Sequence, residues 1–225
     1  MIIDEIWEGA YKGLYGEVVT EDIYRLRQLQ FVPDVIFDLG ANVGTFSRFA
    51  RELFPSSLIV AVEPDKQNIE YFNEFNNPQE NSIVLHNMAI GKGDAYRCIG
   101  AVNGAHESYI SNGLGFESVK ESEAIEKVEI KTTLLDFIVN GWVREGQKYI
   151  IKIDIEGNET ALFSHEPSMS AIRNADYIAM ELHYHALSGD MVEIVKDFTL
   201  SQLDTLKETH NIEHVHPMFY ATKKC

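Results

Sequence analysis

The chain has 225 residues, of which 45% are hydrophobic and 11% aromatic, and its formal net charge is −16. This length can enclose one sizeable hydrophobic core and allows one domain or at most two. The strong negative charge argues against a nucleic-acid partner, because such partners are bound largely through clustered Lys and Arg. No apolar run of about 18 residues is present, so the sequence offers no membrane-spanning helix and we expect no membrane partner.

The composition also bears on compartment and domain organisation. Residues 1–16 contain three acidic residues among their apolar ones and lack the basic start of a signal peptide. The two cysteines, Cys98 and Cys225, do not form a disulfide framework. We therefore expect a reduced, cytoplasmic protein. No linker composition divides the chain, so we expect one domain over residues 31–225, with residues 1–30 packing on it as an N-terminal extension.

The first part of the chain alternates between short apolar runs and segments with helical spacing. Strands are expected at 35–38, 58–62 and 82–85, and helices at 46–53 and 66–75. Strands separated by helices of about ten residues imply right-handed crossovers. The pattern therefore predicts a parallel sheet covered by helices on both faces.

The second part of the chain continues this alternation after an interruption. Between residues 94 and 132 the pattern resembles antiparallel strands around a polar excursion at 103–123, so we expect a hairpin-type insertion there. Beyond it, helices are expected at 134–143, 159–163 and 192–209, and strands at 149–153 and 177–182. Two closing strands, at 212–215 and 218–222, are expected to pair antiparallel.

A glycine turn follows the first expected strand. Gly40 and Gly44 allow the backbone to turn sharply and to approach a ligand closely, and Asn42 and Thr45 are residue types that cap helix N-termini. Asp38, at the end of the strand, distinguishes two ligand classes. It would repel the pyrophosphate of a dinucleotide, whereas S-adenosylmethionine carries an ammonium and a sulfonium. The turn therefore favours the methyl donor.

The next two strands also end in polar groups, where ligands of open parallel sheets bind. Glu63 lies 25 residues after Asp38, close to the spacing at which a carboxylate accepts both ribose hydroxyls of an adenosine. Its alternative role is to cap the helix that begins near Asp65. Asn87 and Ala89 follow the third strand, where the adenine ring would lie. The alternative for Asn87 is a turn or a helix cap.

The fourth strand ends in the sequence IKIDIEG at residues 151–157. Alternation places Lys152, Asp154 and Glu156 on one side if the chain stays extended, which has little value in a core unless the charges are paired or used. In the common strand order His183 ends the neighbouring fifth strand, where it could serve as a general base beside Asp154 and Glu156. Two alternatives remain open. Lys152 could pair with an acid while Glu156 caps a helix, or the carboxylates and His183 could hold a divalent metal.

Together these motifs resemble the FkbM family of S-adenosylmethionine-dependent methyltransferases. The resemblance rests on DLGANVG at 38–44, VEP at 62–64, AIG at 89–91, TLLD at 133–136, IKIDIEG at 151–157 and MELH at 180–183. It implies a class I methyltransferase, or Rossmann-like, α/β fold. In that fold seven mostly parallel strands lie in the order 3-2-1-4-5-7-6, with the last strand antiparallel. It also implies S-adenosylmethionine as cofactor and a hydroxyl acceptor on a sugar, a polyketide or another secondary metabolite.

The preferred hypothesis is an enzyme that transfers the methyl group of S-adenosylmethionine to such a hydroxyl. The expected donor-binding residues are Asp38, Gly40, Asn42, Gly44, Thr45, Glu63, Asn87, Ala89 and Asp154. The expected catalytic residues are Asp154, Glu156 and His183, with His183 or Asp154 removing the hydroxyl proton. A donor-binding scaffold without turnover is the alternative, which the acids at every strand end argue against. An oxidoreductase is disfavoured by Asp38 and by the missing Gly-x-Gly-x-x-Gly.

Overall fold

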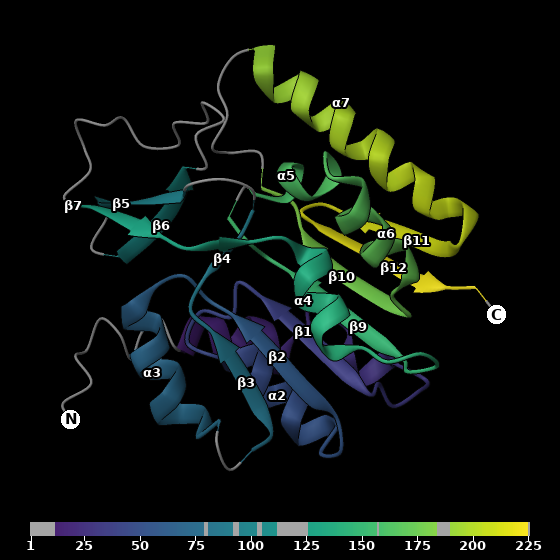
Figure 1. The fold of residues 1–225 in the computed structure, drawn as a ribbon, viewed down its shortest axis with the longest axis horizontal. Coiled ribbons are helices and arrows are strands. Elements are labelled where there is room, and N and C mark those ends of the chain that lie inside the picture. Colours follow the sequence, from purple (N-terminus) through teal and green to yellow (C-terminus); the bar gives the residue numbers. More distant parts are fainter. Residues whose placement is uncertain are drawn as a thin grey trace.

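The structure is a computed structural model that describes residues 12–78, 81–91, 95–102, 105–111, 126–156, 158–183 and 190–224. Its main sheet contains β1 (Val35–Leu39), β2 (Leu58–Val62), β3 (Ile83–His86), β9 (Tyr149–Ile153), β10 (Tyr177–Glu181), β11 (His210–Val215) and β12 (Met218–Lys223). The strands lie in the order β11-β12-β10-β9-β1-β2-β3 (Figure 1). Counted along the chain from the β3 edge, this is the order 3-2-1-4-5-7-6 that the family resemblance implied.

The strand directions also agree with the expectation. The strands from β3 through β2, β1 and β9 to β10 are parallel, whereas β12 runs antiparallel to both β10 and β11. At the centre, β1 is buried along its whole length, as parallel strands covered on both faces are. Its register places Asp38 opposite Lys152 of β9, so two charges face each other inside the sheet.

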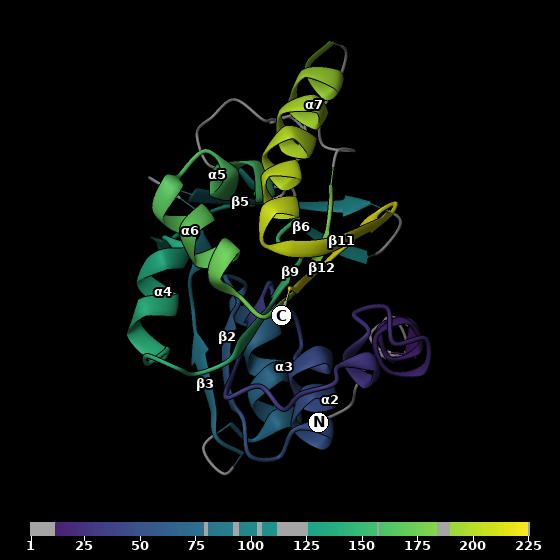
Figure 2. The same ribbon diagram turned by 90° about the vertical axis from the view of Figure 1, so that its right-hand side faces the viewer.

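Helices cover both faces of the main sheet (Figure 2). They are α2 (Thr45–Leu53), α3 (Lys66–Asn76), α4 (Leu135–Trp142), α5 (Glu159–Phe163), α6 (Glu166–Asn174) and α7 (Asp190–Asp204). One hydrophobic cluster joins the sheet to α4, α5, α6 and α7, and the other joins it to α2 and α3. Among the described residues, no helix has the length and apolar character needed to cross a membrane.

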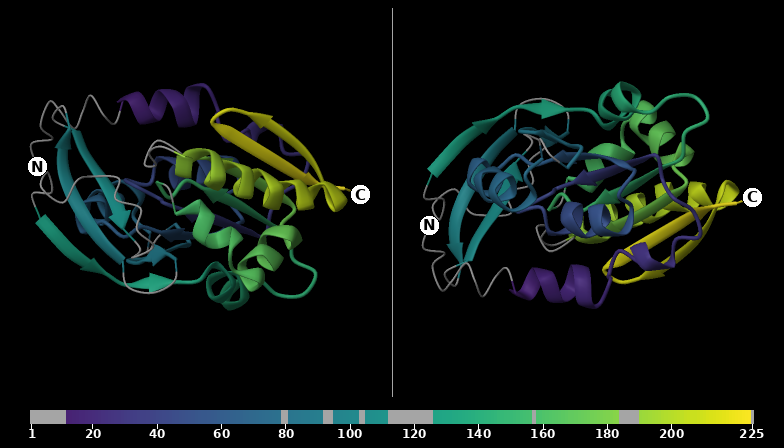
Figure 3. Two further views of the ribbon diagram at one scale, coloured as in Figure 1. Left: turned by 90° about the horizontal axis from the view of Figure 1, so that it is seen from above. Right: turned by 90° about the horizontal axis from the view of Figure 1, so that it is seen from below.

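The insertion forms a sheet of its own. β5 (Ala95–Val102) pairs antiparallel with β6 (Ala105–Ser111) and with β7 (Glu126–Ile130). In the chain, this three-stranded sheet lies between β4 (Ala89–Ile90) and β8 (Thr132–Thr133). β4 and β8 pair with each other, and β4 follows the carboxyl end of β3. Figure 3 shows the three strands at the end of the molecule away from β11 and β12. The hairpin-type insertion is thus confirmed.

Two parts of the sequence interpretation need correction. The polar excursion at 103–123 contains the strand β6, and residues 112–125 lie outside the described residues. The helix α6 (Glu166–Asn174) was not expected. Its N-cap is His165, whose side chain accepts a hydrogen bond from the backbone N–H of Ser168, and a proline lies in its first turn. Such a proline is a helix-start signal that the periodicity alone does not show.

The described part of the N-terminal segment packs against the main sheet. It contains η1 (Gly16–Thr20) and η2 (Leu26–Gln28), and Tyr24 and Leu26 are buried in the cluster that includes α2 and α3. Arg25 forms a bidentate pair with Glu213 of β11, with nitrogen–oxygen distances of 2.8 and 2.7 Å. The hydroxyl of Tyr177 donates to the backbone carbonyl of Tyr24 at 3.0 Å. A domain division at residue 30 stays a prediction.

Candidate functional site

The turn after β1 brings separate parts of the chain into close contact. Gly40 and Gly44 both have left-handed backbone conformations, with φ of +76° and +86°. A Cβ atom on Gly40 would lie 1.7 Å from the backbone oxygen of Asp154, and one on Gly44 would lie 2.2 Å from the Asn76 amide nitrogen. The close approach that the structure shows is therefore to the residue that follows β9 and to α3. An additional approach to a ligand stays a prediction.

The expected helix capping by Asn42 and Thr45 is wrong. α2 begins at Thr45, its N-cap is Gly44, and no side chain caps it. Asn42 has a φ of +50°, and its side-chain oxygen accepts from the N–H of Val43 at 2.8 Å. The turn needs left-handed residues at 42 and 44, which moves Thr45 one position into the helix. Its hydroxyl is buried and has no hydrogen-bond partner among the described residues.

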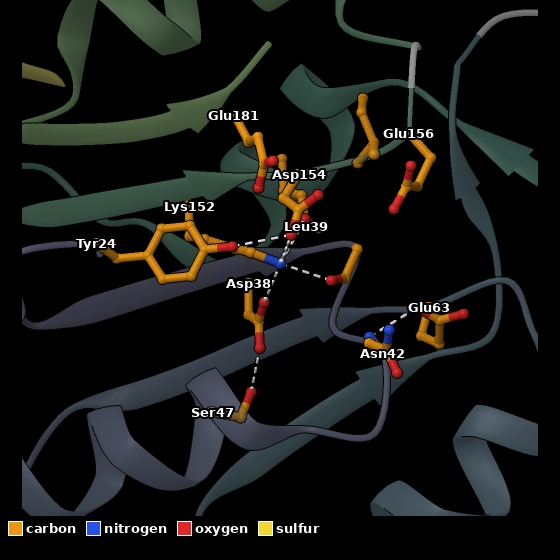
Figure 4. Close-up of polar contacts among 12 residues, drawn as sticks. Tyr24, Asp38, Leu39, Asn42, Ser47, Glu63, Lys152, Asp154, Glu156 and Glu181 are labelled. Atoms are coloured by element: carbon orange, nitrogen blue, oxygen red, sulfur yellow. Dashed lines mark hydrogen bonds and ion pairs between the residues drawn. The ribbon is translucent and has the colours of Figure 1, made fainter. Parts of the chain in front are cut away.

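A buried ammonium group lies beneath this turn (Figure 4). The Lys152 side chain is 4% exposed, and its Nζ lies 3.3 Å from Asp38 Oδ1 and 3.4 Å from Asp154 Oδ2. The same Nζ donates to the carbonyl oxygen of Gly40 at 2.6 Å. Asp38 is fully buried and also accepts from the Ser47 hydroxyl at 2.6 Å. The ion-pair interpretation of Lys152 is thus confirmed, and the charge of Asp38 is compensated within the protein.

Tyr24 completes this group, and no pattern in the sequence marks it as a site residue. Its hydroxyl donates to Asp154 Oδ2 at 2.8 Å, and the Lys152 ammonium lies 5.6 Å from its ring centroid. Burial and the neighbouring Asp154 raise the pKa of Tyr24 well above its ordinary value, so it remains a donor. Burial opposes the charge of Asp154, but Lys152 and His183 lower its pKa below the ordinary value. Asp154 is therefore a carboxylate at neutral pH.

Glu63 connects the turn to the start of α3. Its side chain accepts from the N–H of Asn42 at 2.8 Å, the N–H of Asp65 at 2.9 Å and the amide of Asn68 at 3.3 Å. The alternative role for Glu63 as helix cap is wrong, because Asp65 caps α3 by accepting from the N–H of Gln67. Burial raises the pKa of Glu63 to about 7, although these N–H groups oppose the shift. Its contact with a ribose stays a prediction.

Asn87 contacts the segment that follows β2 through its side chain. Its side-chain amide donates to the carbonyl oxygens of Glu63 and Pro64 at 3.1 and 2.9 Å, which ties the ends of β2 and β3 together. Ala89 is buried and pairs with Thr132. That these residues lie against an adenine ring stays a prediction.

The structure brings together the three expected catalytic residues. The His183 side chain is 8% exposed, and its Nε2 lies 3.8 Å from Asp154 Oδ1 and 3.7 Å from Glu156 Oε2. Its other nitrogen, Nδ1, lies 3.0 Å from Glu159 Oε1. Glu181 adds a fourth carboxylate, 3.7 Å from Nε2. Asp154 and Glu156 follow β9 and His183 follows β10, so the pairing of these strands accounts for the meeting.

Two details of this cluster differ from the expectation. The chain does not stay extended to Glu156, which has a φ of +53°. A turn, rather than strand alternation, therefore places its carboxylate beside His183. Burial alone would lower the pKa of His183, but Glu159, Glu156 and Asp154 raise it to about 9. At neutral pH the ring is an imidazolium, so it could act as a base only after losing a proton.

Comparison with known proteins identifies the family. The model of the methyltransferase FkbM domain matches residues 38–207, which include the turn, Glu63 and the His183 cluster. The chain belongs to this family. It is therefore an S-adenosylmethionine-dependent methyltransferase, with S-adenosylmethionine as its co-substrate. No curated protein matches the chain.

Solved structures share the fold. The proposed rRNA-methylase from Clostridium thermocellum has a TM-score of 0.51 and 10% identity, over 92% of this chain and 97% of that one. The proposed caffeoyl-CoA O-methyltransferase from Staphylococcus aureus has a TM-score of 0.51 and 9% identity, over 99% of this chain and 93% of that one. At such low identity the likeness shows the class I methyltransferase fold and no more.

The packing of the turn predicts unequal costs for two glycine substitutions. Gly146 has a φ of +82°, and nothing lies within 4 Å of the position that a Cβ atom would take there. Gly146→Ala should therefore cost about 1 kcal/mol from the backbone alone. Gly44→Ala adds a clash with Asn76 and Phe72 and should cost about 1–3 kcal/mol more. Urea unfolding of both variants measures the difference. Equal costs would show that α3 does not pack against the turn.

The buried ion pair predicts that Lys152 and Asp38 are energetically coupled in a double-mutant cycle. Lys152→Met should destabilise the fold by about 3–5 kcal/mol, because Asp38 would remain buried without its partner charge. Asp38→Asn in the same chain should restore part of that loss. Chemical denaturation at neutral pH provides the measurement. The single Asp38→Asn variant completes the cycle. If the losses of the two single variants simply add in the double variant, the two side chains are not energetically coupled.

Proposed function

We propose that this methyltransferase transfers the methyl group to a hydroxyl oxygen of a small molecule, such as a sugar, a polyketide or another secondary metabolite. The observation that carries the proposal is the group of four carboxylates around His183, at the carboxyl ends of β9 and β10. Carboxylates accept hydrogen bonds from hydroxyl groups and can accept a proton from one. The net charge of −16 disfavours a nucleic-acid acceptor.

The residues around the turn fit the methyl donor. The buried hydroxyl of Thr45 has no partner in the described part of the chain, and no side chain caps the first turn of α2. These groups suit the carboxylate of the donor's amino-acid end. The acids beyond β9 suit its ammonium and sulfonium. Glu63, 5% exposed beside the turn, would accept ribose hydroxyls.

When bound, the donor supplies a methyl group on its sulfonium, which would pass to the acceptor oxygen while the acceptor's proton leaves to a side chain of the His183 group. Asp38 contributes indirectly, because it forms an ion pair with Lys152. The ammonium group of Lys152 in turn donates a hydrogen bond to the carbonyl oxygen of Gly40. The carboxylates around His183 that do not take the proton would orient the acceptor. Positioning of this kind supplies much of the rate in group transfer.

The function is tested directly with a panel of sugars, polyols and macrolide alcohols. Purified protein and S-adenosylmethionine should give S-adenosylhomocysteine and an O-methylated product, which mass spectrometry identifies after fragmentation. Methylation on nitrogen or carbon would overturn the choice of a hydroxyl. Donor binding by calorimetry without any product would favour the scaffold instead.

A substitution of His183 separates donor binding from turnover. His183→Ala should lower turnover by about 10² to 10⁴, the usual contribution of a positioned acid or base, while the donor dissociation constant stays within a few-fold. His214→Ala, on the exposed side of β11, is the matched control and should change neither. Asp154→Ala should impair both quantities, because Asp154 contacts the network beneath the turn. Full activity of His183→Ala would remove His183 from the mechanism.

The pKa of Glu63 gives donor binding a pH dependence. Ribose hydroxyls favour the carboxylate form, so binding lowers a pKa that stands at about 7 without ligand. Affinity should therefore be highest above that pH and fall by at most tenfold per unit as the pH drops through about 7. Glu63→Gln should weaken binding about tenfold and flatten the profile. Calorimetry between about pH 6 and 8 measures both, and an unchanged slope in the variant would exclude the ribose contact.

A further inference from the structure

The side chains around His183 have the composition of a metal-ligand set. One ligand atom each from Asp154, Glu156 and His183 lies within 4.8 Å of the other two. The set combines two carboxylates with one imidazole, and it comes from the ends of two adjacent strands. Mixed oxygen and imidazole sets suit divalent first-row ions such as Mn²⁺. The separations of 3.7 and 3.8 Å between Nε2 and the carboxylates leave space for an ion between them.

The outer contacts of these side chains match those of metal ligands. A histidine that binds a metal through one nitrogen usually has a carboxylate on the other, which fixes the ring. Here Nδ1 lies 3.0 Å from Glu159 Oε1, so Nε2 is turned toward Asp154 and Glu156. Ligating carboxylates are also hydrogen-bonded from outside. Tyr24 donates to Asp154 Oδ2, which leaves Oδ1 on the His183 side.

The charge balance favours a cation as occupant. Four carboxylates surround His183, and the ammonium of Lys152, which pairs with one of them, is shared with the buried Asp38. A further positive charge would relieve the repulsion among the carboxylates. The donor's sulfonium or ammonium is the competing source of that charge. The two sources are distinguished by whether donor and metal compete.

We propose that Asp154, Glu156 and His183 bind one divalent first-row metal ion, with Tyr24 and Glu159 orienting the ligands. The ion would lie on the acceptor side of the site, where it could hold a hydroxyl oxygen of the substrate. The proposal for the acceptor side rests on the proposed function. The metal site itself does not, because it can be tested without any methyl transfer.

The test uses Mn²⁺ as the probe on the intact, metal-free protein without acceptor. Electron paramagnetic resonance should show one Mn²⁺ bound per chain. Glu156→Gln and His183→Gln should weaken binding at least tenfold, whereas Glu193→Gln, an exposed carboxylate of α7, should leave it unchanged. Tyr24→Phe should weaken it several-fold, since a supporting hydrogen bond of a ligand is lost. Thermal unfolding of each variant shows that the fold persists.

Three results would overturn the proposal. They are the absence of bound Mn²⁺ at millimolar concentration, equal binding by wild type and the His183→Gln variant, and displacement of Mn²⁺ by saturating S-adenosylmethionine. The last would assign the cluster to the donor's own positive charge. Mn²⁺ binding in a protein that methylates no hydroxyl would leave the metal site standing and sink the proposed function alone. Hydroxyl methylation without a Mn²⁺ site would support the proposed function and overturn the metal site alone.

Discussion

The whole site depends on the buried ammonium group of Lys152. A charge in a protein core is tolerated only where opposite charges and hydrogen-bond acceptors surround it. Lys152 has Asp38 and Asp154 as counter-charges and the carbonyl of Gly40 as an acceptor. One side chain of β9 thereby fixes the end of β1, the start of the glycine turn and the first acid of the His183 cluster. Replacing it would disturb all three at once.

Its position also shapes the electrostatics of the neighbouring cluster. Lys152 and Tyr24 both contact Asp154 Oδ2, so the other oxygen faces His183. Lys152 is already shared with Asp38, and therefore it compensates little of the charge of Glu156 and Glu181. The result is a local surplus of carboxylate at the edge where parallel sheets bind ligands. Either the positively charged donor or the proposed metal ion could neutralise this surplus of negative charge. A measurement of whether the two compete for binding therefore distinguishes them.

The fold by itself does not select an acceptor. Two structures that share it at 9 and 10% identity are described as acting on very different molecules, an rRNA and a caffeoyl-CoA. What they share with this chain is the sheet and its covering helices. We expect acceptor choice to come from the segments around the sheet. In this chain these are the sheet of β5, β6 and β7, which follows β3 in the chain, and the N-terminal segment whose Tyr24 contacts Asp154.

Local patterns in the sequence were sufficient for most elements, because apolar spacing determines which segments become strands or helices. The same patterns located Glu63, Lys152 and His183 at strand ends, and the family motifs supplied the strand order. Tertiary structure decided which of these side chains meet. Tyr24 reaches Asp154 across 130 residues of sequence, and no period or spacing records such a contact. The role of Thr45 changed because the left-handed turn needed the capping position for Gly44. Periodicity reflects interactions between residues that are close in the sequence. A buried charge instead pairs with an opposite charge that the fold brings beside it, however distant that residue is in the sequence.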